Sequence, residues 1–190
     1  MYKKQMTLQR ITCYLTLAAS ALVFIYSLGI MTDLYDALYL YTDKYYYVQG
    51  AEVYLNMQEF NRNFTAAGVA LILSAVSFFV FNNHNRRKYY VANYITLGIN
   101  TALNVGVSAW ALINVLSYKA DFLKIDFVKL KEMSEKYSTY YTESTFWFDI
   151  SFVVFGVLLV ATALNLLNLI CKLVVMGAEK SAIRKSARRR

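Results

Sequence analysis

The chain contains four long stretches without a single Asp, Glu, Lys or Arg, and they constrain its fold more than any other feature. They run over residues 11–32, 63–85, 89–118 and 150–171. A helix needs about 20 mostly apolar residues to cross the hydrocarbon core of a bilayer, and each stretch reaches that length. The sequence therefore predicts an all-α fold: a polytopic membrane protein built as a four-transmembrane-helix bundle with helical outer loops.

The charged residues are sorted between the segments that connect these stretches. Segments 33–62 and 119–149 hold 11 of the 12 Asp and Glu residues, whereas 13 of the 20 Lys and Arg residues lie elsewhere. Lys and Arg concentrate on the cytosolic side of membrane proteins, so we expect a multi-pass protein with cytosolic N- and C-termini. This sorting also accounts for the net charge of +8, and we expect no nucleic-acid partner.

These observations set the predicted boundaries within a single membrane domain over residues 1–190. The spans cover about 11–32, 63–82, 89–118 and 147–172, the outer loops 33–62 and 119–146, and a basic cytosolic tail 173–190. Basic residues beside the spans are expected to contact anionic lipids. They are Arg86, Arg87 and Lys88 after the second span and Arg184, Lys185, Arg188, Arg189 and Arg190 in the tail.

The third span carries two faces that lipid would not favour. One face holds Asn93, Asn100, Asn104 and Ser108, and the other, about 195° away, holds Gly98, Ala102 and Gly106. Small residues let helices pack closely in lipid, and polar residues hydrogen-bond between helices. We therefore expect the glycine face to be a close-packing surface and the asparagine face to pack helices or line a pore.

The fourth span adds Asn165 and Asn168 near its cytosolic end. Counted from that surface, Asn165 matches the depth of residues 97–100, and Asn168 matches that of Asn93. This predicts Asn–Asn hydrogen bonds between spans three and four. Two alternatives stay open, namely that Asn100 and Asn104 line a water-filled path or that these amides border a groove for lipid or a cofactor.

The outer loops carry helical patterns. In the first, Leu34, Leu38, Tyr41 and Tyr45 share a helical face, although 45–48 could form a short strand, and Gly50 is expected to break the chain before a helix from Ala51. In the second loop, one apolar stripe predicts an amphipathic helix that caps the bundle or lies on the outer leaflet. The stripe consists of Ala120, Leu123, Phe127, Leu130, Met133 and Tyr137.

The sequence carries no pattern typical of an enzyme, and we expect a non-enzymatic function. Two isolated cysteines, Cys13 and Cys171, and one histidine form no catalytic, cofactor or metal-binding pattern. We expect an accessory or structural subunit that assembles with itself or with other membrane proteins in the lipid bilayer. The alternative is an oligomeric pore or channel lined by the asparagine face of the third span.

Overall fold

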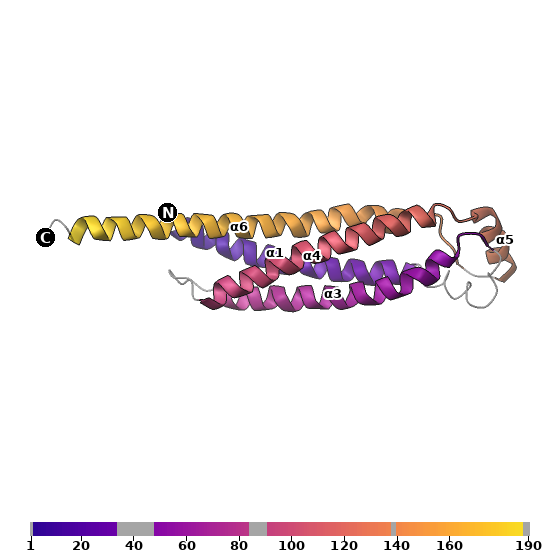
Figure 1. The fold of residues 1–190 in the computed structure, drawn as a ribbon, viewed down its shortest axis with the longest axis horizontal. Coiled ribbons are helices and arrows are strands. Elements are labelled where there is room, and N and C mark those ends of the chain that lie inside the picture. Colours follow the sequence, from indigo (N-terminus) through magenta and orange to yellow (C-terminus); the bar gives the residue numbers. More distant parts are fainter. Residues whose placement is uncertain (1, 34–47, 84–90, 138–139, 188–190) are drawn as a thin grey trace.

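Every regular element that the computed structural model describes is a helix. The structure describes residues 2–33, 48–83, 91–137 and 140–187. The helices are α1 (Tyr2–Asp33), α3 (Glu52–Asn82), α4 (Val91–Phe122), α5 (Phe127–Tyr137) and α6 (Phe146–Ala187), as Figure 1 shows. The predicted all-α class is thus confirmed for the described residues.

Four of these helices, α1, α3, α4 and α6, are long and apolar enough to cross a membrane. α1, α3 and α6 each include a predicted span and extend beyond it, whereas α4 begins at Val91, inside the third predicted span of 89–118, and ends beyond it at Phe122. A proline inside a helix would remove a backbone hydrogen bond, and the chain contains none. All four helices run without interruption. The largest extension is that of α6, which continues beyond the predicted end at residue 172 to Ala187 and projects past the other helices (Figure 1).

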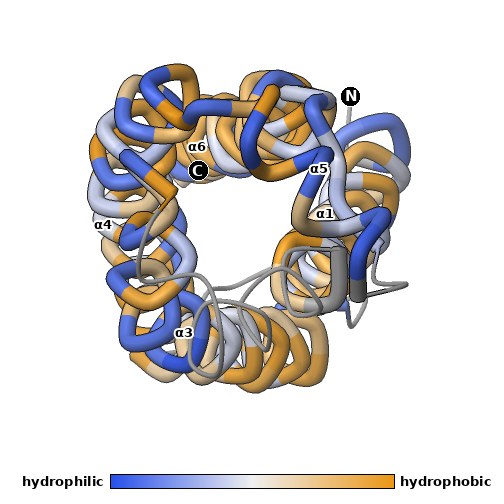
Figure 2. Tube along the Cα trace, turned by 90° about the vertical axis from the view of Figure 1, so that its right-hand side faces the viewer, coloured by the Kyte–Doolittle hydropathy of each residue, from blue (hydrophilic) through white to orange (hydrophobic). Residues whose placement is uncertain are grey.

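The four long helices stand at the corners of a square (Figure 2). Two of them, α1 and α4, occupy opposite corners, and each packs against both α3 and α6. Successive helices run in opposite directions (Figure 1), which gives an up-down four-helix bundle.

The interior of the bundle divides into an apolar half and a polar half. The apolar half lies toward α5, and Phe64 is near its centre, with ring centroids 5.7 Å from Tyr26 and 5.9 Å from Phe155. Most of the buried polar side chains of the long helices lie in the other half, toward the N-terminus of α1 and the C-terminal part of α6. Aromatic packing thus holds one half together, and hydrogen bonds join the helices in the other.

The segment between α4 and α6 does not form the single helix that the apolar stripe predicted. That prediction is wrong between Phe122 and Phe127, where the chain leaves α4 and turns before α5 begins. Asp126 accounts for the break, because its carboxylate accepts a hydrogen bond from the backbone N–H of Lys129 and so caps α5. Leu123 is consequently 60% exposed, while Leu130 is buried in the apolar core, so α5 caps the bundle.

The segment between α1 and α3 is described only from Val48 onward. The predicted break at Gly50 is confirmed, since this residue has a φ of +84° that favours glycine. Beside it, the backbone N–H of Asp126 donates to the carbonyl of Gln49 at 3.1 Å, which ties the segment before α3 to the segment before α5. The predicted helix from Leu34 to Tyr45, and the alternative strand up to residue 47, lie outside the described residues.

Candidate functional site

The two predicted faces of α4 point in opposite directions. Asn93, Asn100, Asn104 and Ser108 are all buried, and Asn104 has no exposed surface at all. Gly98, Ala102 and Gly106 are exposed on the outside of the bundle. The asparagine face therefore belongs to the interior of its own chain, and the glycine face does not pack against the other helices that the structure describes.

Asparagines of α4 join three helices near the middle of the bundle. Asn100 donates a hydrogen bond of 3.0 Å to Ser74 on α3. Asn104 donates to the side-chain oxygen of Asn100 at 3.1 Å and to the hydroxyl of Thr162 on α6 at 2.8 Å. Each amide thus bonds to a neighbouring helix while the two also bond to each other.

The asparagines of α6 bond to α1, so the predicted Asn–Asn bonds between spans three and four are wrong. Asn165 donates to Thr16 at 2.6 Å, and Asn168 accepts from Gln5 at 3.0 Å. The reason lies in the direction of each side chain around the axis of α6, which stands between α1 and α4. Thr162 and Asn165 are three residues apart, so their side chains point about 60° away from each other around that axis. This difference directs Thr162 to α4 and Asn165 to α1.

A second polar cluster, which the sequence analysis missed, closes the bundle at the N-terminal end of α1. Gln9 is its centre: its amide nitrogen donates to the carbonyl of Asn82 on α3. Its amide oxygen accepts from Gln5 at 3.2 Å and from the ammonium of Lys172 on α6 at 3.2 Å. Asn82 continues the cluster through a bond of 3.2 Å to Thr96 on α4, so all four long helices contribute.

The sequence signal for this cluster was a polar stripe that extends further back than the predicted first span. Gln5 and Gln9 continue the face of Thr12, Thr16 and Ser20 at spacings of three and four residues. Both glutamines precede the predicted first span, which begins at residue 11. Lys172 is the last residue of the predicted fourth span, yet only 2% of its surface is exposed.

Several buried side-chain oxygen atoms have no hydrogen-bond partner among the described residues. Those of the polar face include Ser20 on α1, Asn104 and Ser108 on α4, and Asn165 on α6. Buried polar atoms in folded proteins are nearly always partnered, by protein or by ordered water. Water molecules held inside the bundle would supply the missing partners.

The outward face of α4 is open around its two glycines. A Cβ atom built on Gly98 or Gly106 would meet no atom within 4 Å. Exposed apolar side chains flank the glycines, including Ile95, Ile99 and Val105. In lipid, a glycine-rich apolar face allows the backbone of another helix to approach closely.

The basic residues predicted to contact anionic lipids lie mostly beyond the described part of the chain. Lys185 is exposed on the projecting end of α6, and Arg184 lies beside it in the helix. Arg86, Arg87, Lys88 and Arg188 to Arg190 fall outside the described residues.

Among the described residues, no three His, Cys, Asp or Glu side chains gather as a metal site would require. Cys13 is buried in the bundle, and Cys171 is exposed on α6. Comparison of the chain with protein-family models, curated proteins and solved structures gives no match.

Proposed function

We propose that this chain is a multi-pass membrane protein that acts as an accessory or structural subunit, assembling with itself or with other membrane proteins. Four helices that are long and apolar enough to span a bilayer support the membrane location. The sorting of basic and acidic residues supports cytosolic termini and an outer position for α5. The partners are the bilayer, anionic lipids at its cytosolic face, and one or more further protein chains.

The observation that carries the assembly role is the open glycine face of α4. Apolar side chains gain nothing by leaving lipid for a helix surface, so helices associate in a membrane through close packing and hydrogen bonds. Gly98 and Gly106 have the free space that close approach of another helix requires. The proposed role is non-enzymatic, and we assign no catalytic, cofactor or metal-binding residue. In this proposal the buried amides serve to hold the helices of the chain together.

Replacing each α4 glycine with leucine tests this role. We expect Gly98→Leu and Gly106→Leu to hold the partner helix away and to convert a larger complex into the single chain on native gel electrophoresis. Membrane insertion should persist, because leucine is apolar and favours helix more than glycine.

Gly156→Leu is the matched control, because a Cβ on this glycine of α6 also meets nothing within 4 Å. The control should leave the complex intact. Equal loss of the complex in all three variants, or no complex in the wild type, would contradict the assignment of the assembly surface to α4.

A second candidate function, a water-filled path, is favoured by the unpartnered oxygens of Asn104, Ser108, Asn165 and Ser20. Since Asn100 and Asn104 face the interior of their own bundle, such a path would run through one chain rather than between copies. Replacing both asparagines with leucine should then abolish ion conductance in liposomes. For the accessory role we expect no conductance from the wild type.

A further inference from the structure

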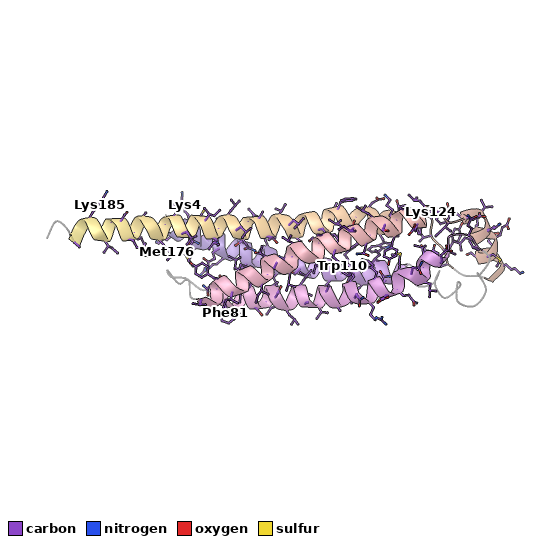
Figure 3. All side chains as sticks on the ribbon, in the orientation of Figure 1. Lys4, Phe81, Trp110, Lys124, Met176 and Lys185 are labelled. Carbon is purple, nitrogen blue, oxygen red and sulfur yellow. The ribbon has the colours of Figure 1, made fainter. Side chains whose placement is uncertain are left out.

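A groove runs along the outside of the bundle where the N-terminal part of α1 lies against the C-terminal part of α6. Its volume is about 410 Å³, within the usual range for small-molecule sites of about 300–1,000 Å³. The groove is lined by Lys4, Gln5 and Leu8 of α1 and by Ile170, Cys171, Val174, Val175 and Ala178 of α6. Figure 3 shows Lys4 at this end of the molecule, beside the part of α6 that continues to Met176 and Lys185.

The two walls of the groove are fixed to each other by the polar cluster behind them. Gln5 donates to Asn168 on α6 at 3.0 Å and to Gln9 at 3.2 Å, so its side chain is held between the helices. The apolar side chains that line the groove, such as Val174, make no such hydrogen bonds, and 66% of the surface of Val174 is exposed. The groove is therefore a preformed apolar surface with a fixed floor.

A single positive charge distinguishes this groove from a similar one on the same helix pair. The second groove, of about 360 Å³, is lined by Leu15 of α1 and by apolar residues of α6 that include Val153 and Gly156, with no charged residue. Lys4 in the first groove is exposed and forms no ion pair with any described residue. The first groove thus combines an apolar wall with an available ammonium group.

We propose that this groove binds one anionic glycerophospholipid of the cytosolic leaflet. The proximal part of an acyl chain lies along Leu8, Ile170 and Val174, and the phosphate reaches the ammonium of Lys4. Charge complementarity supports this occupant, because basic residues at the cytosolic surface attract anionic headgroups. The inference rests on the proposed membrane location and adds a defined lipid site to it.

Native mass spectrometry of the purified chain tests the site. The chain is extracted in mild detergent and supplied with equal amounts of phosphatidylglycerol and phosphatidylcholine. We expect the wild type to retain one phosphatidylglycerol in preference to phosphatidylcholine. Lys4→Gln should lower that preference about fivefold, the effect of removing one basic residue near an anionic headgroup. Val174→Trp should fill the groove and remove the retained lipid.

Two matched variants separate a defined site from general attraction. Lys3→Gln removes the same charge from the adjacent exposed position, and Val153→Trp places the same ring in the uncharged groove at a valine that is 63% exposed. Neither should change retention. Equal loss in Lys3→Gln and Lys4→Gln, or undiminished retention in Val174→Trp, would overturn the lipid site.

Extraction of cell membranes with alkaline carbonate distinguishes a failure of the proposed membrane location from a failure of the lipid site alone. A chain that carbonate releases contradicts both the membrane location and the lipid site. A chain that stays in the membrane but retains phosphatidylglycerol and phosphatidylcholine equally contradicts the lipid site alone.

Discussion

Asn104 on α4 donates a hydrogen bond of 2.8 Å to Thr162 on α6, two helices that are neighbours in the square. The same amide group bonds to Asn100, whose own nitrogen reaches Ser74 on α3. At the end of the bundle near α5, the ion pair between Lys119 and Asp149, at 2.5 Å, joins α4 to α6 again. Polar contacts thus join α4 to α6 at two positions along the bundle, one near its middle and one at the end near α5.

Asn104→Leu should destabilise the bundle by about 0.6–1.7 kcal/mol, because it removes the interhelical hydrogen bond to Thr162, and such bonds contribute about 0.6 kcal/mol on average and up to about 1.7 kcal/mol in membranes. Unfolding by SDS in mixed micelles measures this change. Asn114→Leu is the control, since Asn114 on the same helix bonds to the carbonyl of Trp110 in its own helix, and should stay within about 0.5 kcal/mol. Equal losses would show that the Asn104–Thr162 bond carries no stability.

Thr16→Val and Asn165→Leu should be coupled, because each removes one partner of the same 2.6 Å bond. We expect the double variant to lose less stability than the sum of the two single variants, by about 0.6–1.7 kcal/mol. Thr16→Val with Asn100→Leu gives the comparison, since α1 and α4 stand at opposite corners, and should be additive within about 0.5 kcal/mol. Coupling in the second pair but not in the first would contradict the observed arrangement.

Gly29→Ala should destabilise the protein by about 1–3 kcal/mol, because the added methyl group would overlap the ring of Trp147. Gly156→Ala, where the methyl group meets nothing within 4 Å, should instead be neutral or stabilising by up to about 1 kcal/mol. Unfolding in mixed micelles gives the stabilities. Trp147 fluorescence in a Trp110→Phe background reports the displaced ring, and an unshifted spectrum in Gly29→Ala would refute the overlap.

Single cysteines introduced at Glu135 on α5 and at Lys185 on α6 test the orientation, because both positions are exposed. Cys13→Ala and Cys171→Ser first remove the native thiols. We expect an impermeant maleimide to label the Glu135→Cys variant on intact cells and the Lys185→Cys variant only after permeabilisation. The reverse pattern would invert the topology, and labelling of both on intact cells would contradict the four-span arrangement.

The helices and their polar faces could be predicted from the sequence because both follow from local patterns. The length of each uncharged stretch identifies a helix, and the 3.6-residue period places Asn93, Asn100 and Asn104 on one side of it. The period does not say how each helix is rotated between its two neighbours. The choice of α1 rather than α4 as the partner of Asn165 depends on that rotation and could not be read from the sequence.

Two further features depended on contacts between distant segments. Gln5 and Gln9 are buried only because α1 continues beyond its apolar stretch and packs against Asn82 and Lys172. The turn between α4 and α5 forms where the backbone of Asp126 bonds to Gln49 before α3, whereas the apolar stripe alone favoured one continuous helix. The polar stripe of α1 and the cap at Asp126 are local patterns, but the contacts that bury the glutamines and that join Asp126 to Gln49 come from segments distant in the sequence.

The mass of the native complex tests the assembly role most directly. The wild-type chain is extracted from its own membrane in polymer discs, without detergent, and the protein content of each disc is weighed by native mass spectrometry. We expect a mass above the 21.8 kDa of one chain, equal to at least one further copy or one other membrane protein. Discs that hold only the single 21.8 kDa chain would contradict the proposed role.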